Sequence, residues 1–215
     1  IVELLNVRFI SPILGWGACV NVTILKTTDG GSTWQKLTTG TFTVLQAVSF
    51  IDEKHGWLTG EGGLIMVTEN GGRSWKKQSN QDTTNNSLLS VHFANQKEGW
   101  AVGKAGTVIH SADGGSTWID QKGKTASSLS SLCMLTNNVG WASGGNGALI
   151  HTVDGGKIWE DRTEDSSVPH SNGMPEPIWG IHFASEDIGL AAAEFGVILR
   201  TVDAGATWTA LNPRP

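Results

Sequence analysis

The stretch that decides the fold is residues 99–118, which read GWAVGKAGTVIHSADGGSTW. It contains a Gly-Trp pair, a short apolar run and a polar turn around Asp113, and it closes on Trp118. Short runs of apolar and β-branched residues between Gly-rich turns are typical of β-strands, and no helical periodicity runs through them. The stretch therefore predicts short antiparallel strands joined by tight turns.

The same phrase recurs five times along the 215 residues. Successive closing tryptophans are 41, 43, 41 and 49 residues apart; they are Trp34, Trp75, Trp118, Trp159 and Trp208. Four units also contain a Gly-Trp pair, whose tryptophan stands 18 residues before the closing Trp. In the fifth unit Gly189-Leu190 takes the place of this pair. A constant period of this length is the signature of a repeat architecture.

Each unit is predicted to form four strands. In the third unit these are residues 89–94, 99–103, 107–111 and 117–121. A single four-stranded sheet cannot bury both of its faces, whereas several sheets arranged around an axis can. We therefore predict an all-β fold, a five-bladed β-propeller of four-stranded antiparallel blades, as a single domain over residues 1–215. The blades fall approximately at 1–40, 41–81, 82–124, 125–165 and 166–215.

The acidic residue of the turn has a structural explanation. A Ser or Thr two positions earlier and the Asp itself can bond to the backbone of the turn, and the glycines that follow tolerate positive φ. The closing Trp offers a large apolar surface for packing. Because the motif recurs in every unit, we interpret these positions as structural: Asp29, Asn70, Asp113, Asp154 and Asp203, with their five tryptophans.

These residues resemble the Asp-box (BNR) repeat, and all five units match it. The longer combination at residues 99–118 resembles the photosystem II stability/assembly factor family and its bacterial relatives. That resemblance implies a lumenal or exported propeller that binds a membrane-protein precursor and has no known catalysis. Asp-box propellers also include sialidases and xyloglucanases, but retaining sialidases use a Tyr nucleophile and this chain contains no Tyr.

Composition narrows the range of partners and sites. The net charge is -5 with no basic run, which argues against nucleic acid and acidic lipid. No apolar stretch approaches the roughly 18 residues of a membrane helix. The two cysteines fall in units 1 and 4, so we expect no disulfide, and no metal-ligand spacing or cofactor motif is present. The abundance of Ser, Thr, Asn and Gly favours an exported protein: periplasmic, lumenal or extracellular.

The candidate binding face is formed by the loops between strands two and three. These loops vary within a constant frame, as a repeat protein requires for an asymmetric site. They share a face with the blade-to-blade links, of which the one after Thr163 carries the main insertion and leads into Trp179. Long loops in compact folds are often binding loops. The predicted binding residues are Glu61, Lys104, Asn146, Glu194, His170, Asn172, Glu176 and Trp179.

The preferred hypothesis is a non-catalytic scaffold that binds a protein partner. A carbohydrate-binding, lectin-like propeller is the alternative, suggested by Trp and Asn at loop positions. A glycoside hydrolase fragment is the third, suggested by Glu61 and Glu194. No catalytic residue is assigned. Every blade comes from one continuous stretch, so either side-chain packing closes the ring or further blades are missing; an incomplete ring would expose sheet faces and oligomerise.

Overall fold

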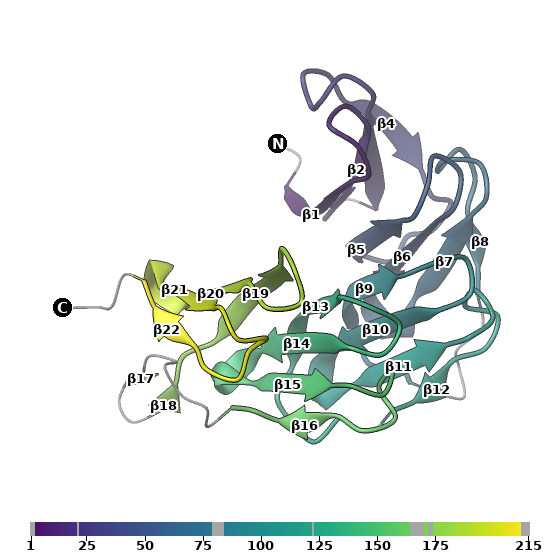
Figure 1. Ribbon diagram of the computed structural model, residues 1–215. Coiled ribbons are helices and arrows are strands. Elements are labelled where there is room, and N and C mark those ends of the chain that lie inside the picture. Colours follow the sequence, from purple (N-terminus) through teal and green to yellow (C-terminus); the bar gives the residue numbers. More distant parts are fainter. Residues whose placement is uncertain are drawn as a thin grey trace. The chain divides into compact units, whose positions relative to one another are not determined.

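The computed structural model describes residues 3–20, 22–78, 84–121, 123–163, 170–171 and 174–211 (Figure 1). Within these residues the chain forms five four-stranded antiparallel sheets and one two-stranded hairpin. The residues group into two compact units. Unit 1 comprises residues 1–101 and 109–120, and unit 2 comprises residues 102–108 and 121–215. The all-β prediction and its five four-stranded sheets are confirmed.

Each sheet contains four consecutive strands in sequence order, as predicted. The first is β1 (Leu4–Phe9), β2 (Gly15–Cys19), β3 (Thr23–Thr27) and β4 (Gln35–Thr38). The second is β5 (Leu45–Phe50), β6 (Gly56–Gly60), β7 (Ile65–Thr68) and β8 (Lys76–Lys77). The third is β9 (Leu88–Phe93), β10 (Gly99–Gly103), β11 (Val108–Ser111) and β12 (Ile119–Asp120). The fourth is β13 (Leu129–Met134), β14 (Gly140–Gly144), β15 (Leu149–Thr152) and β16 (Glu160–Asp161). The fifth is β19 (Ile178–Phe183), β20 (Gly189–Ala193), β21 (Ile198–Thr201) and β22 (Thr209–Ala210).

The fourth strand is shorter than the sequence predicts. In the third sheet it begins at Ile119 rather than at Thr117. The backbone N–H of Thr117 donates instead to Asp113 Oδ1 at 2.8 Å, and its hydroxyl donates to Asp113 Oδ2 at 2.7 Å. The turn thus takes the hydrogen bonds that would otherwise extend the ladder.

The turn between strands three and four is held by the carboxylate in its centre. In the first sheet the Thr27 hydroxyl donates to Asp29 Oδ1 at 2.7 Å and accepts from Gly31 N at 2.9 Å. The Thr33 hydroxyl and N–H both donate to Asp29, at 2.6 and 2.9 Å. These bonds, the Thr33 hydroxyl first, lower the pKa of Asp29 to about 2.

Asparagine replaces this aspartate in the second sheet without loss of the turn. Asn70 Oδ1 accepts from the Thr68 hydroxyl at 3.0 Å and from Ser74 N at 3.0 Å. Its amide nitrogen donates to the Ser74 hydroxyl at 2.8 Å. The amide therefore supplies an acceptor and a donor where the carboxylate supplies two acceptors.

In unit 1 the tryptophans of the first two Gly-Trp pairs pack on the first strand of the next sheet. Trp16 stacks on Phe50 and Trp57 stacks on Phe93, with centroids 3.7 and 3.6 Å apart. The Trp16 indole N–H also donates to the Gly71 carbonyl at 3.2 Å. Apolar stacking and one directed bond to a turn together fix neighbouring sheets in register.

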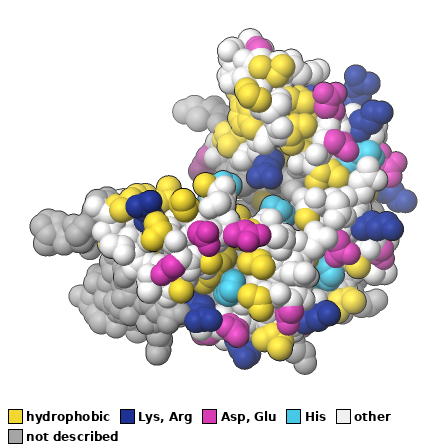
Figure 2. Space-filling view, in the orientation of Figure 1, with side chains coloured by type: hydrophobic (Ala, Val, Ile, Leu, Met, Phe, Trp, Pro, Cys, Tyr) yellow, Lys and Arg dark blue, Asp and Glu magenta, His cyan; other side chains and the backbone are white. Residues whose placement is uncertain are grey.

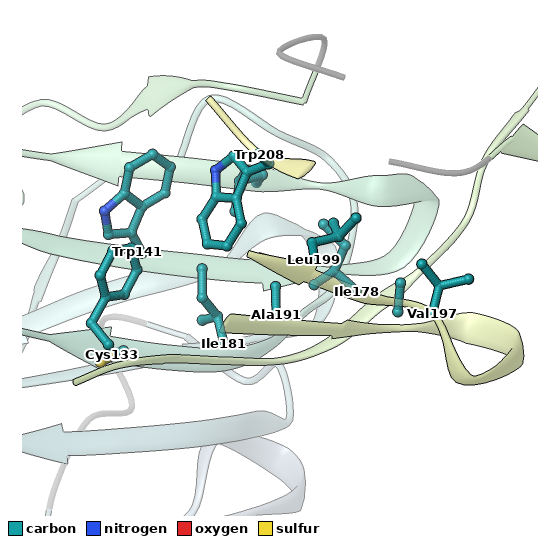
Figure 3. Packing of buried hydrophobic residues seen from close by; sticks show 11 residues of the cluster. Cys133, Trp141, Ile178, Ile181, Ala191, Val197, Leu199 and Trp208 are labelled. Atoms are coloured by element: carbon teal, nitrogen blue, oxygen red, sulfur yellow. The ribbon is translucent and has the colours of Figure 1, made fainter. Parts of the chain in front are cut away.

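In unit 2 the fourth and fifth sheets share a buried apolar cluster (Figure 3). Trp208 lies edge-on to Trp141, with centroids 6.0 Å apart and planes at 83°. Phe183 packs against both rings, and Ile178 and Leu199 are fully buried in the same cluster. Each of these large aromatic side chains buries more apolar surface than an aliphatic neighbour.

The first and fifth sheets each keep an apolar face exposed. On β1, Leu4, Val7 and Phe9 are 45%, 46% and 40% exposed, whereas Phe50, at the position of Phe9 in the second sheet, is 2% exposed. On β20, Leu190 replaces the tryptophan of the Gly-Trp pair and is 47% exposed. These are the faces through which the sequence predicted oligomerisation, and that stays a prediction.

Candidate functional site: the loops between the second and third strands

Four of the five connections between strands two and three form the same short 3-10 turn. They are η1 (Glu61–Gly63), η2 (Lys104–Gly106), η3 (Gly145–Gly147) and η4 (Glu194–Gly196). In three of these turns the first residue donates its N–H to a backbone carbonyl of the segment before its own sheet. Glu61 donates to Val44 at 3.0 Å, and Gly145 and Glu194 donate to Ser128 and Pro177, both at 2.9 Å. In an antiparallel sheet these turns lie at the opposite end from the Asp turns, so the loop face is separate from the structural motif.

The middle residue of each turn adopts the left-handed backbone conformation. Its φ is 59° at Gly62, 55° at Ala105, 53° at Asn146 and 58° at Phe195. Glycine and asparagine tolerate this region, but a bulky residue pays a steric cost in it. The fifth sheet therefore holds an aromatic residue where backbone sterics favour glycine.

Three of the predicted residues lie on separate turns. Glu61 and Lys104 are the exposed first residues of η1 and η2. Asn146 is the exposed middle residue of η3, where its amide donates to the Ser127 hydroxyl at 3.2 Å. Glu61 belongs to unit 1, whereas Lys104 and Asn146 belong to unit 2.

The fifth sheet brings two predicted residues together. The Trp179 indole N–H donates to Glu194 Oε2, which links β19 to η4. Trp179 is 55% exposed, although tryptophan is highly buried on average. Its backbone carbonyl lies 3.4 Å from the Ser130 hydroxyl of the neighbouring fourth sheet. An aromatic surface and a fixed carboxylate thus face solvent at the same loop.

The insertion before the fifth sheet contains a two-stranded hairpin that the sequence did not predict: β17 (His170–Ser171) and β18 (Met174–Pro175) (Figure 1). His170 stands in β17, and Asn172 lies outside the described residues. Glu176, which follows β18, is only 8% exposed. Among the described residues its Oε1 is buried without a hydrogen-bond partner.

Phe195 is the site residue that sequence reasoning missed. It is 58% exposed at the tip of η4, next to Glu194. The sequence contains a signal for it: the aligned turns carry the small or polar residues Gly, Ala and Asn at this position, and only the fifth repeat carries an aromatic residue there among these four turns. Trp179, Glu194, Phe195 and Glu176 are hereafter called the fifth-sheet site.

Charged side chains of both signs are visible on the face drawn in Figure 2, where Lys and Arg are interspersed with Asp and Glu. Among the described residues no three His, Cys, Asp or Glu side chains gather as a metal site. No helix of the described residues is long and apolar enough to cross a membrane. The site offers hydrogen bonds, carboxyl oxygens and aromatic surface.

Two overlapping segments of the chain match the profile of a known family. Residues 34–125 and 120–202 match the profile of a family described as photosynthesis system II assembly factor YCF48. The two segments span most of the five repeats. No curated protein matches the chain.

Solved structures show the same fold at low sequence identity. YCF48 bound to a D1 peptide is 19% identical, with a TM-score of 0.68 over 97% of this chain and 81% of that one. YCF48 from Cyanidioschyzon merolae is 18% identical, with a TM-score of 0.66 over 99% of this chain and 85% of that one. A GH74 enzyme from Niastella koreensis is 16% identical, with a TM-score of 0.72 over 97% of this chain and 38% of that one. These matches confirm the β-propeller fold.

Proposed function

Since the chain belongs to the YCF48 family of photosynthesis system II assembly factors, we propose that it is a non-catalytic scaffold that binds a protein partner. A structure of YCF48 holds a D1 peptide, so a propeller of this fold can present a peptide-binding surface. The loop face is the proposed binding face. It is the part of each repeat that varies while the strands and Asp turns stay constant.

The fifth-sheet site carries the proposal. Trp179 and Phe195 are large, rigid and more than half exposed, and residues of this kind dominate the energy of protein interfaces. The hydrogen bond from the Trp179 indole to Glu194 holds the ring in place before a partner arrives. A preorganised ring loses little conformational entropy on binding.

A carbohydrate-binding propeller is the second candidate. An exposed indole beside a carboxylate could also stack on a sugar ring and accept its hydroxyl protons, and Trp179 is the observation that favours this reading. The hydrolase candidate would need a pair of carboxyl groups flanking the bond that is cleaved. Its two proposed acids, Glu61 and Glu194, belong to different units.

Parallel peptide and glycan arrays separate the candidates. The purified chain is applied to immobilised peptides that include the D1 peptide, to a polysaccharide array, and to xyloglucan with product analysis. Peptide binding that Trp179→Ala abolishes, without sugar release, supports the scaffold. Glycan binding with no peptide binding contradicts it, and release of sugars that requires Glu194 identifies an enzyme.

We extend the proposal to location: the protein acts outside the cytoplasm. Its abundance of Ser, Thr, Asn and Gly supports this, as does the family resemblance. Cell fractionation of a tagged chain in its own host tests it, and recovery in the cytoplasmic fraction alone would refute it.

A further inference from the structure

The fifth-sheet site places an aromatic ring in solvent at the cost of backbone strain. Phe195 has a φ of 58° and is 58% exposed. A left-handed conformation is sterically unfavourable for a non-glycine residue. Burial of the ring recovers little of this cost, because more than half of Phe195 stays exposed. Residues held in strained backbone conformations cluster at active sites and ligand-binding sites, where the strain is part of the mechanism.

The glycines next to the two exposed aromatic residues have free space on their Cβ side. A Cβ built on Gly180, next to Trp179 in β19, would meet no atom within 4 Å, and the same holds at Gly196, next to Phe195. The backbone beside each exposed ring is therefore not covered by other parts of the described chain at these two positions.

Glu176 supplies an observation that points to a ligand. Its side chain is more than nine-tenths buried, yet among the described residues its Oε1 has no hydrogen-bond partner. Leaving a buried polar group unsatisfied is destabilising, and more so when the group is charged. Such a group in a folded protein calls for an explanation, and a donor supplied by a bound molecule is one.

The backbone ties Glu176 to the loop that carries the other site residues. The Glu194 N–H donates to the carbonyl of Pro177, the residue after Glu176, at 2.9 Å. The segment with the buried carboxyl thus lies against η4, and the Trp179 indole bonds to Glu194 from the adjoining strand. Trp179, Glu194 and Phe195 therefore lie at the same end of the fifth sheet as the backbone segment that carries Glu176.

We infer that the fifth-sheet site binds a cationic side chain, an arginine or lysine of the protein partner. A guanidinium stacks on aromatic faces and presents five N–H donors, and an ammonium is attracted to the same faces. Glu194 would accept charge-assisted hydrogen bonds from it, and Glu176 Oε1, which is buried in the unbound chain, would accept one only after the cationic side chain displaces what covers it. A neutral sugar could stack on the indole, but it would bring no charge to the buried carboxyl. This inference rests on the proposed function and specifies the chemistry of its partner.

The test compares three fluorescein-labelled nonapeptides of Gly and Ser that carry three central Arg, Gln or Glu residues. Binding to the purified chain is followed by fluorescence anisotropy at low and high salt. The Arg peptide should bind tighter than the Gln peptide by about threefold to tenfold, and salt should weaken it. The Glu peptide should bind most weakly.

Substitutions place the binding on the fifth sheet. Trp179→Ala and Glu194→Gln should each weaken the Arg peptide by about threefold to tenfold. Glu61→Gln is the matched control, because it removes the same charge at the aligned position of η1, and it should change the affinity less than twofold. Glu176→Met removes the buried carboxyl at similar volume; it should weaken the Arg peptide while the folded structure, checked by circular dichroism, persists.

Each outcome decides between the two proposals. Equal binding of the Arg and Gln peptides overturns the cationic site, while array peptides that still bind leave the scaffold function standing. An equal effect of Glu61→Gln and Glu194→Gln overturns the site as well, because it shows attraction to acidic surface in general. Failure of every array peptide refutes the scaffold function itself. Competition by a neutral glycan that depends on Trp179 assigns the site to carbohydrate.

Discussion

The indole of Trp16 lies flat on the ring of Phe50, with centroids 3.7 Å apart and planes at 6°. Space for this ring comes from Gly56, which pairs with Phe50 across the sheet. A Cβ at Gly56 would stand 2.5 Å from the Phe50 ring. The glycine of one Gly-Trp pair thus makes room for the aromatic ring on which the tryptophan of the preceding pair stacks, and this explains why the two residues recur together.

Removing the Phe50 ring should destabilise unit 1 strongly. Phe50→Ala deletes a side chain that is 2% exposed and leaves a cavity against Trp16, so we expect a loss of about 3–5 kcal/mol in the free energy of unfolding. Urea denaturation followed by tryptophan fluorescence measures it. Phe9→Ala is the matched control, because Phe9 holds the same position on β1 and is 40% exposed. Equal losses for the two variants would show that the stacking contributes nothing.

Adding one methyl group at Gly56 should also destabilise the fold. Gly56→Ala places a Cβ only 2.5 Å from the nearest atom of the Phe50 ring, well within van der Waals contact. Such overpacking costs about 1–3 kcal/mol. Gly180→Ala serves as the comparison, since its added Cβ meets nothing within 4 Å. Thermal unfolding should show a lower midpoint for the first variant and an unchanged or higher one for the second. A tolerated Gly56→Ala would disprove the steric explanation of the Gly-Trp pair.

The Asp turns should make the protein sensitive to acid. Hydrogen bonds from Thr33 to Asp29 and from Thr207 to Asp203 lower the pKa of both carboxyls, to about 2 for Asp29. A depressed folded pKa contributes stability that is present above the unfolded value of 3.8 and is lost as the pH falls through the folded pKa. Stability should therefore fall between about pH 4 and pH 2.

Exchanging Asp and Asn tests this origin of the acid sensitivity. Asp203→Asn should flatten the fall in thermal midpoint between pH 4 and pH 2, because one titrating group is removed. Asn70→Asp should steepen it. The second sheet shows that Asn can hold the turn, so both variants should fold at pH 7. Identical pH profiles for wild type and variants would exclude the turns as the source.

Phe195→Asn should stabilise the fold and weaken binding to peptides. Asn146 holds the same position of η3 in the same left-handed conformation, and asparagine tolerates that region better than phenylalanine. We expect the free energy of unfolding to rise by about 0.5–1 kcal/mol and binding to array peptides to weaken. Calorimetry and the peptide array measure the two effects. Lower stability together with unchanged binding would show that Phe195 serves packing.

The repeat determined most of the fold. The spacing of the Gly-Trp pairs and Asp turns located five four-stranded sheets, because strand period and turn chemistry are local properties. The ends of the fourth strands were less well predicted. Thr117 was expected in a strand, but its N–H and hydroxyl bond to Asp113 in the turn. Such competition for hydrogen bonds is visible only when both partners are placed.

The site divides in the same way. The sequence by itself identified Trp179, Glu194 and Glu176 as candidates. They lie in loops, or next to an insertion, that differ between otherwise similar repeats, and such differences are found by aligning the repeats. Only the tertiary structure joined Trp179 to Glu194, buried Glu176 without a partner for its Oε1 among the described residues, and set Phe195 in a strained conformation at the surface. These properties depend on segments brought together from separate strands and loops, and burial and hydrogen bonding between such segments have no local signature in the chain.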